Sequence, residues 1–225
     1  MEQIIPVLGL FASFISLLGV FLFFYSLFKI EPAFLPLLTL SAVTILTYIG
    51  GLFGKLGEAV FILYIAGTVA LIYSIILIIR KKMDPIPILK SPAIWIFVLC
   101  CVYFVVRMRG MQSLHVDNSS HWATIIKEMC LTDAFPSTGS AITFRNYTPG
   151  SAVFIYYVCS AVGYTEGSAL MAQGFLLSAA VATFFCKAKI KAPITFLSLM
   201  IASAVSVSIP ELISGSLHYY NFLGK

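Results

Sequence analysis

Long apolar runs without a charged residue are the feature that most constrains this chain. They cover residues 3–28, 32–54, 59–79, 91–106, 146–165, 167–186 and 192–210. A helix needs about 20 mostly apolar residues to cross a bilayer, and most of these runs approach that length. Of all residues, 60% are hydrophobic and 10% are charged, whereas soluble domains carry roughly 25% charged residues. We therefore predict an all-α fold, a polytopic transmembrane helix bundle that forms one domain over residues 1–225.

The basic residues predict how this bundle is oriented. Two connections are strongly basic: Arg80, Lys81, Lys82 and Lys90 follow the third run, and Lys187, Lys189 and Lys191 follow the sixth. Lys and Arg favour the cytoplasmic side of a membrane, so both connections are expected there. This is possible only if the short segment 151–163 does not cross. We predict about six spans in the cell membrane, a re-entrant or interfacial helix at 151–163, and the polar loop 107–150 on the outer face.

The net charge of +5, from 14 Lys and Arg against 9 Asp and Glu, is small for a chain of 225 residues. In a membrane protein such an excess more often sets topology than binds nucleic acid. We expect no nucleic-acid partner.

Polar chemistry concentrates in the outer loop, around the stretch "VDNSSHWATIIKEM" at 116–129. The apolar residues recur at helical spacing, as Trp122, Ile125, Ile126, Met129 and Cys130. This spacing predicts an amphipathic helix, lying at the membrane interface with its apolar side down. Asp117 would stand near its N-terminus, where an ionised carboxylate is favoured and could accept a proton from a hydroxyl. Alternatively, Asp117 only caps the helix.

Three arginines in the loop are candidates for binding a phosphate. Arg107 and Arg109 could bind a lipid phosphate or could simply flank a span. Arg145 precedes the turn "NYTPG", where it could hold a phosphate with two parallel hydrogen bonds or form a surface ion pair. The sequence alone leaves these alternatives open.

The other polar residues of the loop could also have either a functional or a purely structural role. His115, Asp117 and His121 are metal-ligand types, but no HExxH pair is present. We expect no cofactor and no metal, with a divalent ion as the minor alternative. The simplest structural roles are a hydrogen bond for His121, an interfacial anchor for Trp122, and a solvated helix face for Lys127 and Glu128.

The order of these motifs resembles that of a known family. The stretches "DNSSHWATIIKEM", "FPS" and "NYTPGSAVFIYYVCSAVGYTEGSALMAQGFLLSAAVATFF" follow one another after a span. This order resembles the GT-C superfamily of polytopic membrane glycosyltransferases over about residues 92–190. It is most similar to bacterial members whose first large outer loop carries an acidic pair followed by a Ser-His-Trp helix.

The resemblance assigns roles to single residues. It makes Asp117 the catalytic acid, which acts as a general base on the acceptor in an inverting transfer. Asn118 stands where an acidic partner often follows in the family, which weakens the case for a metal. The matching positions are Ser120, His121 and Trp122 for the helix signature, Lys127, Glu128 and Met129 for its end, and Tyr147, Pro149 and Gly150 for a Tyr-Pro-Pro-Gly turn in which Thr148 replaces the first proline.

The implied function is transfer of a sugar from a polyprenyl-phosphate donor to a cell-envelope acceptor on the outer face. The expected substrate-binding residues are His121, Trp122, Lys127, Glu128, Arg145 and Tyr147, and the donor phosphate would be held by Arg107, Arg109 and Arg145. Family members are usually longer, so we expect a truncated member, or a partner chain that supplies further C-terminal spans. Membrane lipid is the other expected partner. The alternative function is a non-catalytic assembly or lipid-binding subunit.

Overall fold

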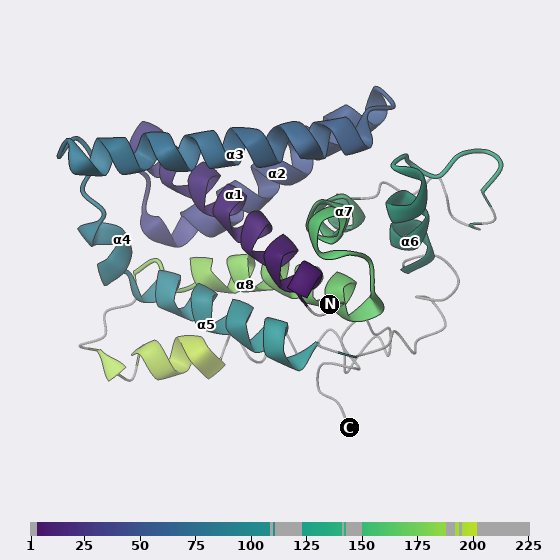
Figure 1. The fold of residues 1–225 in the computed structure, drawn as a ribbon. Coiled ribbons are helices and arrows are strands. Elements are labelled where there is room, and N and C mark those ends of the chain that lie inside the picture. Colours follow the sequence, from purple (N-terminus) through teal and green to yellow (C-terminus); the bar gives the residue numbers. More distant parts are fainter. Residues whose placement is uncertain are drawn as a thin grey trace.

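The computed structural model describes residues 4–108, 110, 123–140, 142, 150–187, 192–193 and 195–201. The described part of the chain is helical, as predicted (Figure 1). Its elements are α1 (Ile4–Phe28), the 3₁₀ helix η1 (Pro32–Phe34), α2 (Leu35–Leu52), α3 (Leu56–Ile79), α4 (Ile86–Lys90), α5 (Pro92–Arg107), α6 (Ala123–Thr132), α7 (Gly150–Val162) and α8 (Glu166–Thr183). Residues 195–201 are also helical.

Three helical stretches are long and apolar enough to cross a membrane: Val7–Phe28, Pro32–Leu52 and Leu56–Ile79. The most apolar window of α3 has only 11% of its residues buried within the protein. Large apolar side chains left open on this scale require an apolar surrounding. The all-α fold is thus confirmed for the described residues, with three helices that could cross a membrane by their length and composition. The transmembrane bundle of about six spans stays a prediction.

Small residues bring α1 and α3 together as a close parallel pair. Gly19 faces the backbone of α3, and Gly67 faces Ser16 of α1, with no room for a side chain at either glycine. The Ser16 hydroxyl donates a hydrogen bond to the Leu63 carbonyl at 3.1 Å. Small residues that allow backbones to approach are typical of helix pairs in membranes. In Figure 1, α3 runs along the top of the molecule and α1 descends from beneath it towards α7.

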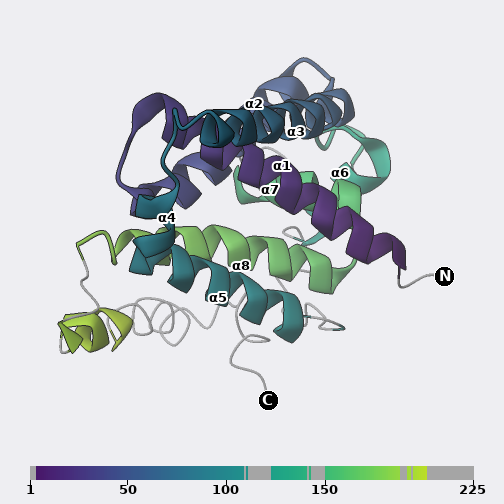
Figure 2. The same cartoon turned by 60° about the vertical axis from the view of Figure 1, so that its left-hand side comes forward.

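The helices α5 and α8 lie side by side and run in opposite directions (Figure 2). Gly174 of α8 faces the ring of Phe104 near the end of α5. At the other end of the pair, Ala93 and Ala182 share a small apolar cluster with Ala33 of η1. The beginning of α5 and the end of α8 therefore lie at the same end of the molecule.

This arrangement gathers the described basic connections at one end. We call it the basic end, defined by the exposed residues Lys29, Arg80, Lys81, Lys82, Lys90 and Lys187. The opposite end, here the loop end, holds α6, the end of α5 and the beginnings of α3 and α8. The structure thus agrees with the expectation that the two basic connections share one side. Lys189 and Lys191 lie outside the described residues, and the side of the membrane that the basic end faces stays a prediction.

The helix α7 lies inside the molecule. Every residue from Ala152 to Cys159 is buried, and the helix packs against α1, α2, α3, α6 and α8. In Figure 1, α3 runs across the view while α7 is seen nearly end-on. An interfacial helix would keep one face open, whereas a helix that is apolar all round is buried. The burial of α7 therefore differs from the interfacial alternative, and whether the helix is re-entrant stays a prediction.

Candidate functional site

The amphipathic helix expected in the outer loop is present as α6. Its apolar stripe is buried at Ile125, Ile126 and Met129, while Lys127 is exposed and Glu128 is half-buried. The stripe packs against α7 and α8, so it faces protein. This differs from the predicted position at the membrane interface, in which the stripe faces lipid. Because α7 is apolar on all sides, it offers α6 a surface that the spacing of α6 alone could not reveal.

The C-terminal end of α6 is fixed by a hydrogen bond to the core helix. The Tyr156 hydroxyl donates to the Asp133 carboxylate at 2.6 Å. A side chain at Gly57, in the first turn of α3, would lie 3.4 Å from Asp133 and 3.6 Å from the Tyr156 hydroxyl. Three elements far apart in the sequence therefore meet at one exposed carboxylate.

Burial, and after it the same contact, raise the pKa of the tyrosine. Burial raises the pKa of Tyr156 far above its ordinary value of 10, and the neighbouring Asp133 carboxylate raises it further. A tyrosine that stays neutral remains a hydrogen-bond donor. The Tyr156 hydroxyl therefore remains able to donate to Asp133 at neutral pH.

A second hydrogen bond fixes the N-terminal end of α6. The Tyr164 hydroxyl, from the connection between α7 and α8, donates to the Ala123 carbonyl at 3.3 Å. Burial first, and Glu166 second, raise the pKa of Tyr164 to about 12. Ala123 directly follows His121 and Trp122 in the sequence. The bond therefore ties the described beginning of α6 to the connection between α7 and α8 at the loop end of the bundle.

The segment after α6 folds back onto the polar face of that helix. The Ser140 hydroxyl donates to the Glu128 carboxylate at 2.5 Å, and the same hydroxyl accepts from the Ile142 backbone N–H at 3.2 Å. Glu128 thus has a structural partner in addition to the substrate-binding role expected from the resemblance. Its other carboxylate oxygen has no hydrogen bond to the described residues.

The structure locates some of the predicted site residues. Arg107 is exposed at the end of α5, and Lys127 and Glu128 lie on α6, all three at the loop end. No hydrogen bond or ion pair joins Arg107 to either of the other two. The remaining predictions, Arg109, Asp117, His121, Trp122, Arg145 and Tyr147, fall outside the described residues.

Three residues of this site, Asp133, Tyr156 and Ser140, are absent from the set predicted from the sequence. Asp133 carries a local signal, since it directly follows the predicted helix in "LTDAFP". Tyr156 sits in an apolar run, where nothing local shows that its hydroxyl meets a residue 23 positions away. Ser140 gives no signal that separates it from the other serines of the loop.

The charged side chains at the loop end determine which kinds of ligand the described part of the site could bind. Among the residues that the structure describes there, Lys55 pairs with Glu58 at 3.1 Å, while Asp133 and Lys127 stay exposed. No three His, Cys, Asp or Glu side chains of the described ranges gather as a metal site would need. His115, Asp117 and His121, the candidate metal ligands, lie outside those ranges.

Comparison with known proteins adds no relative. No family model, no curated protein and no solved structure matches the chain. The likeness to GT-C enzymes therefore stays a prediction that rests on the short motifs of the loop.

Proposed function

We propose that this chain is a membrane glycosyltransferase of the GT-C type, or a truncated part of one. It would transfer a sugar from a polyprenyl-phosphate donor to an acceptor of the cell envelope. The observation that supports the proposal best is the double anchoring of α6, by Tyr164 at its beginning and Tyr156 at its end. Catalysis needs reacting groups held in place. Because α6 directly follows the predicted site residues in the sequence, an anchored α6 would help to hold those residues in place.

In the proposed reaction, the Asp117 carboxylate takes the proton from the acceptor hydroxyl. The hydroxyl oxygen attacks the anomeric carbon of the donor, and the bond from this carbon to the phosphate oxygen breaks. The electron pair of that bond leaves with the polyprenyl phosphate, and the configuration at carbon inverts. Arg145, together with Arg107 or Arg109, stabilises the charge that develops on the leaving phosphate.

The other predicted residues position the substrates. His121 and Trp122 would orient the acceptor beside Asp117, and the polar face of α6 would add Lys127 and Glu128. The apolar helices hold the site at the surface of a membrane, where the prenyl tail of the donor is dissolved. Further spans from a partner chain would complete the donor pocket.

The direct test is the Asp117→Asn variant, assayed for sugar transfer in membranes from cells that express the chain. A positioned general base typically contributes about 10²–10⁴-fold to the rate, so we expect turnover to fall by at least about 100-fold. Glu58→Gln is the matched control, because it removes an exposed carboxylate from the same end and leaves both the proposed base and the anchors of α6 intact. Turnover that is equal in Asp117→Asn and in the unchanged chain contradicts the mechanism.

A second candidate is a non-catalytic assembly subunit, favoured by the open apolar face of α3. Phe61, Ile65 and Val69 are each more than half exposed, and such a face could receive the helices of a partner. Only the transferase function requires particular side chains in the loop. If Asp117, His121 and Arg145 each tolerate alanine in a complementation assay, the assembly function is supported and the transferase is not.

A further inference from the structure

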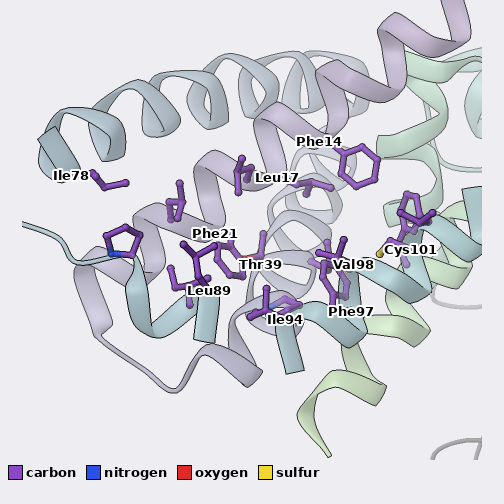
Figure 3. Close-up of a pocket in the computed structure, with 18 residues that line it drawn as sticks. Phe14, Leu17, Phe21, Thr39, Ile78, Leu89, Ile94, Phe97, Val98 and Cys101 are labelled. Atoms are coloured by element: carbon purple, nitrogen blue, oxygen red, sulfur yellow. The ribbon is translucent and has the colours of Figure 1, made fainter. Parts of the chain in front are cut away.

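A cavity of about 470 Å³ lies between helices at the basic end (Figure 3). Its wall comes from the second half of α1, the beginnings of α2 and α5, the end of α3, the short helix α4 and one residue of α8. The lining side chains are apolar, apart from the hydroxyl of Thr39 and the thiol of Cys101. Pockets of roughly 300–1,000 Å³ typically hold small ligands, and this one offers surroundings suited to a hydrocarbon.

The cavity is about as deep as one leaflet of a membrane. Its wall extends along α1 from Phe14 to Leu22 and along α5 from Ile94 to Val102. Eight residues of helix rise about 12 Å, and half of a hydrocarbon core is about 15 Å. A chain that entered at the basic end would therefore reach approximately the middle of the bilayer.

The cavity is open to the lipid side. Leu18, Leu89 and Val98 line it and remain 48%, 58% and 41% exposed. In Figure 3, Leu89 and Val98 lie on opposite parts of the same hollow. A lipid tail could enter sideways from the surrounding leaflet, without passage through the core of the protein.

Basic residues flank the lining residues in the sequence at the basic end, and Lys82 precedes the lining residue Pro85 by three positions. Arg80 follows the lining residue Ile78 by two positions, and Lys90 directly follows the lining residue Leu89. The basic end carries six exposed cations against two exposed carboxylates, Glu31 and Asp84. None of the six pairs with a carboxylate of the described ranges, so their charge is available to a ligand.

We propose that this cavity binds one acyl chain of an anionic phospholipid, whose phosphate is held by Arg80, Lys82 and Lys90. Each Lys or Arg near a membrane surface attracts an anionic headgroup, and the apolar cavity holds the tail. The proposal is independent of the transferase, because the donor phosphate would be held at the loop end, at the opposite end of the molecule.

The experiment measures which lipids stay on the purified chain. The detergent-solubilised protein is incubated with equal amounts of dioleoyl phosphatidylglycerol and dioleoyl phosphatidylcholine, washed, and its retained lipids are quantified by mass spectrometry. We expect phosphatidylglycerol to be retained in clear excess. Each surface cation favours an anionic lipid about fivefold, so the triple variant Arg80→Gln, Lys82→Gln, Lys90→Gln should lower this preference at least about tenfold.

Two matched controls separate the parts of the proposal. The variant Lys29→Gln, Lys55→Gln, Lys187→Gln removes the same charge from exposed positions outside the proposed phosphate site and should keep the preference. Val98→Phe narrows the cavity and should lower retention of both lipids, whereas Ile72→Phe, on an exposed face of α3 outside the cavity, should not. The proposal is overturned if the unchanged chain retains both lipids equally, if the two charge variants behave alike, or if Val98→Phe retains as much lipid as Ile72→Phe.

Discussion

Asp133 ends α6 in a backbone conformation that few residues adopt. Its φ is +50°, in the left-handed region, where Asn and Asp are tolerated better than most side chains. The Asp133 N–H still donates to the Met129 carbonyl at 2.9 Å, and the left-handed φ of Asp133 then ends the helix. The turn places the carboxylate against Tyr156, so backbone and side chain together determine where α6 stops.

At this scale we predict that Tyr156→Phe destabilises the protein. The variant keeps the buried ring but removes the hydroxyl that donates to Asp133. A hydrogen bond to a charged group contributes about 1.5–3 kcal/mol, and because Asp133 is exposed we expect about 1.5 kcal/mol. Thermal unfolding in detergent measures the change. Tyr73→Phe, at an exposed tyrosine of α3, is the control and should unfold at an unchanged temperature.

The same pair predicts a dependence on alkaline pH. The pKa of Tyr156 is raised in the folded protein, so the folded state favours the neutral hydroxyl. The stabilisation is fully present below the unfolded pKa of about 10 and is lost as the pH rises towards the folded pKa. The stability difference between the unchanged chain and Tyr156→Phe should therefore be constant from pH 7 to about pH 9 and shrink above pH 10. A difference that falls already between pH 7 and pH 9 contradicts this assignment.

At the scale of the elements, the sequence predicts the helices closely. The runs at 3–28 and 91–106 correspond to α1 (Ile4–Phe28) and α5 (Pro92–Arg107). The run at 59–79 misses the first turn of α3, because Glu58 ended the charge-free stretch. An acidic residue is favourable in the first turn of a helix, so a charge there is compatible with a longer helix.

What the sequence could not supply are contacts between distant elements. The Tyr64 hydroxyl donates to the Tyr157 carbonyl at 2.6 Å, 93 residues away, and the two rings stack at 4.7 Å. Local spacing carries no information about such a pair. The same limit applies to the candidate site. The apolar stripe of α6 could be predicted from its helical period. The attachment of α6 to Tyr156 and Tyr164 could not, because it depends on how α7 is buried.

The pairing of α1 with α3 gives a prediction at this scale. A methyl group at Gly67 would overlap Ser16 of α1, so Gly67→Ala must push the two helices apart. Overpacking typically costs about 1–3 kcal/mol, and we expect a loss of that size in thermal unfolding. Gly150→Ala is the control, because nothing lies within 4 Å of the added carbon. Equal melting temperatures for Gly67→Ala and the unchanged chain contradict the close packing of the pair.

At the scale of the whole molecule, the two ends differ in charge. The basic end has six exposed cations and two carboxylates, whereas the described part of the loop end has Lys55, Arg107 and Lys127 against Glu58, Glu128, Asp133 and Glu166. The balances are therefore +4 and −1. Since basic connections stay in the cytoplasm, the loop end is predicted to face outward.

Labelling of single cysteines tests this orientation. Ser137→Cys places a thiol at an exposed position of the loop end, and Lys82→Cys places one at the basic end. A membrane-impermeant maleimide should label Ser137→Cys on intact cells and should label Lys82→Cys only after the membrane is opened. The unchanged chain, with its five native cysteines, gives the background. The opposite pattern contradicts an outward-facing loop end.

Native mass spectrometry of the purified chain, beside its Asp117→Ala and Arg145→Ala variants, tests the proposed transferase by the lipid that each protein retains. If the loop end forms the donor site of a glycosyltransferase, the unchanged chain retains a polyprenyl phosphate or its sugar conjugate. Arg145→Ala loses it, because the arginine holds the phosphate, and Asp117→Ala keeps it, because the base acts on the acceptor. If all three proteins retain ordinary phospholipid in equal amounts and none retains a polyprenyl species, the proposed donor site at the loop end is contradicted.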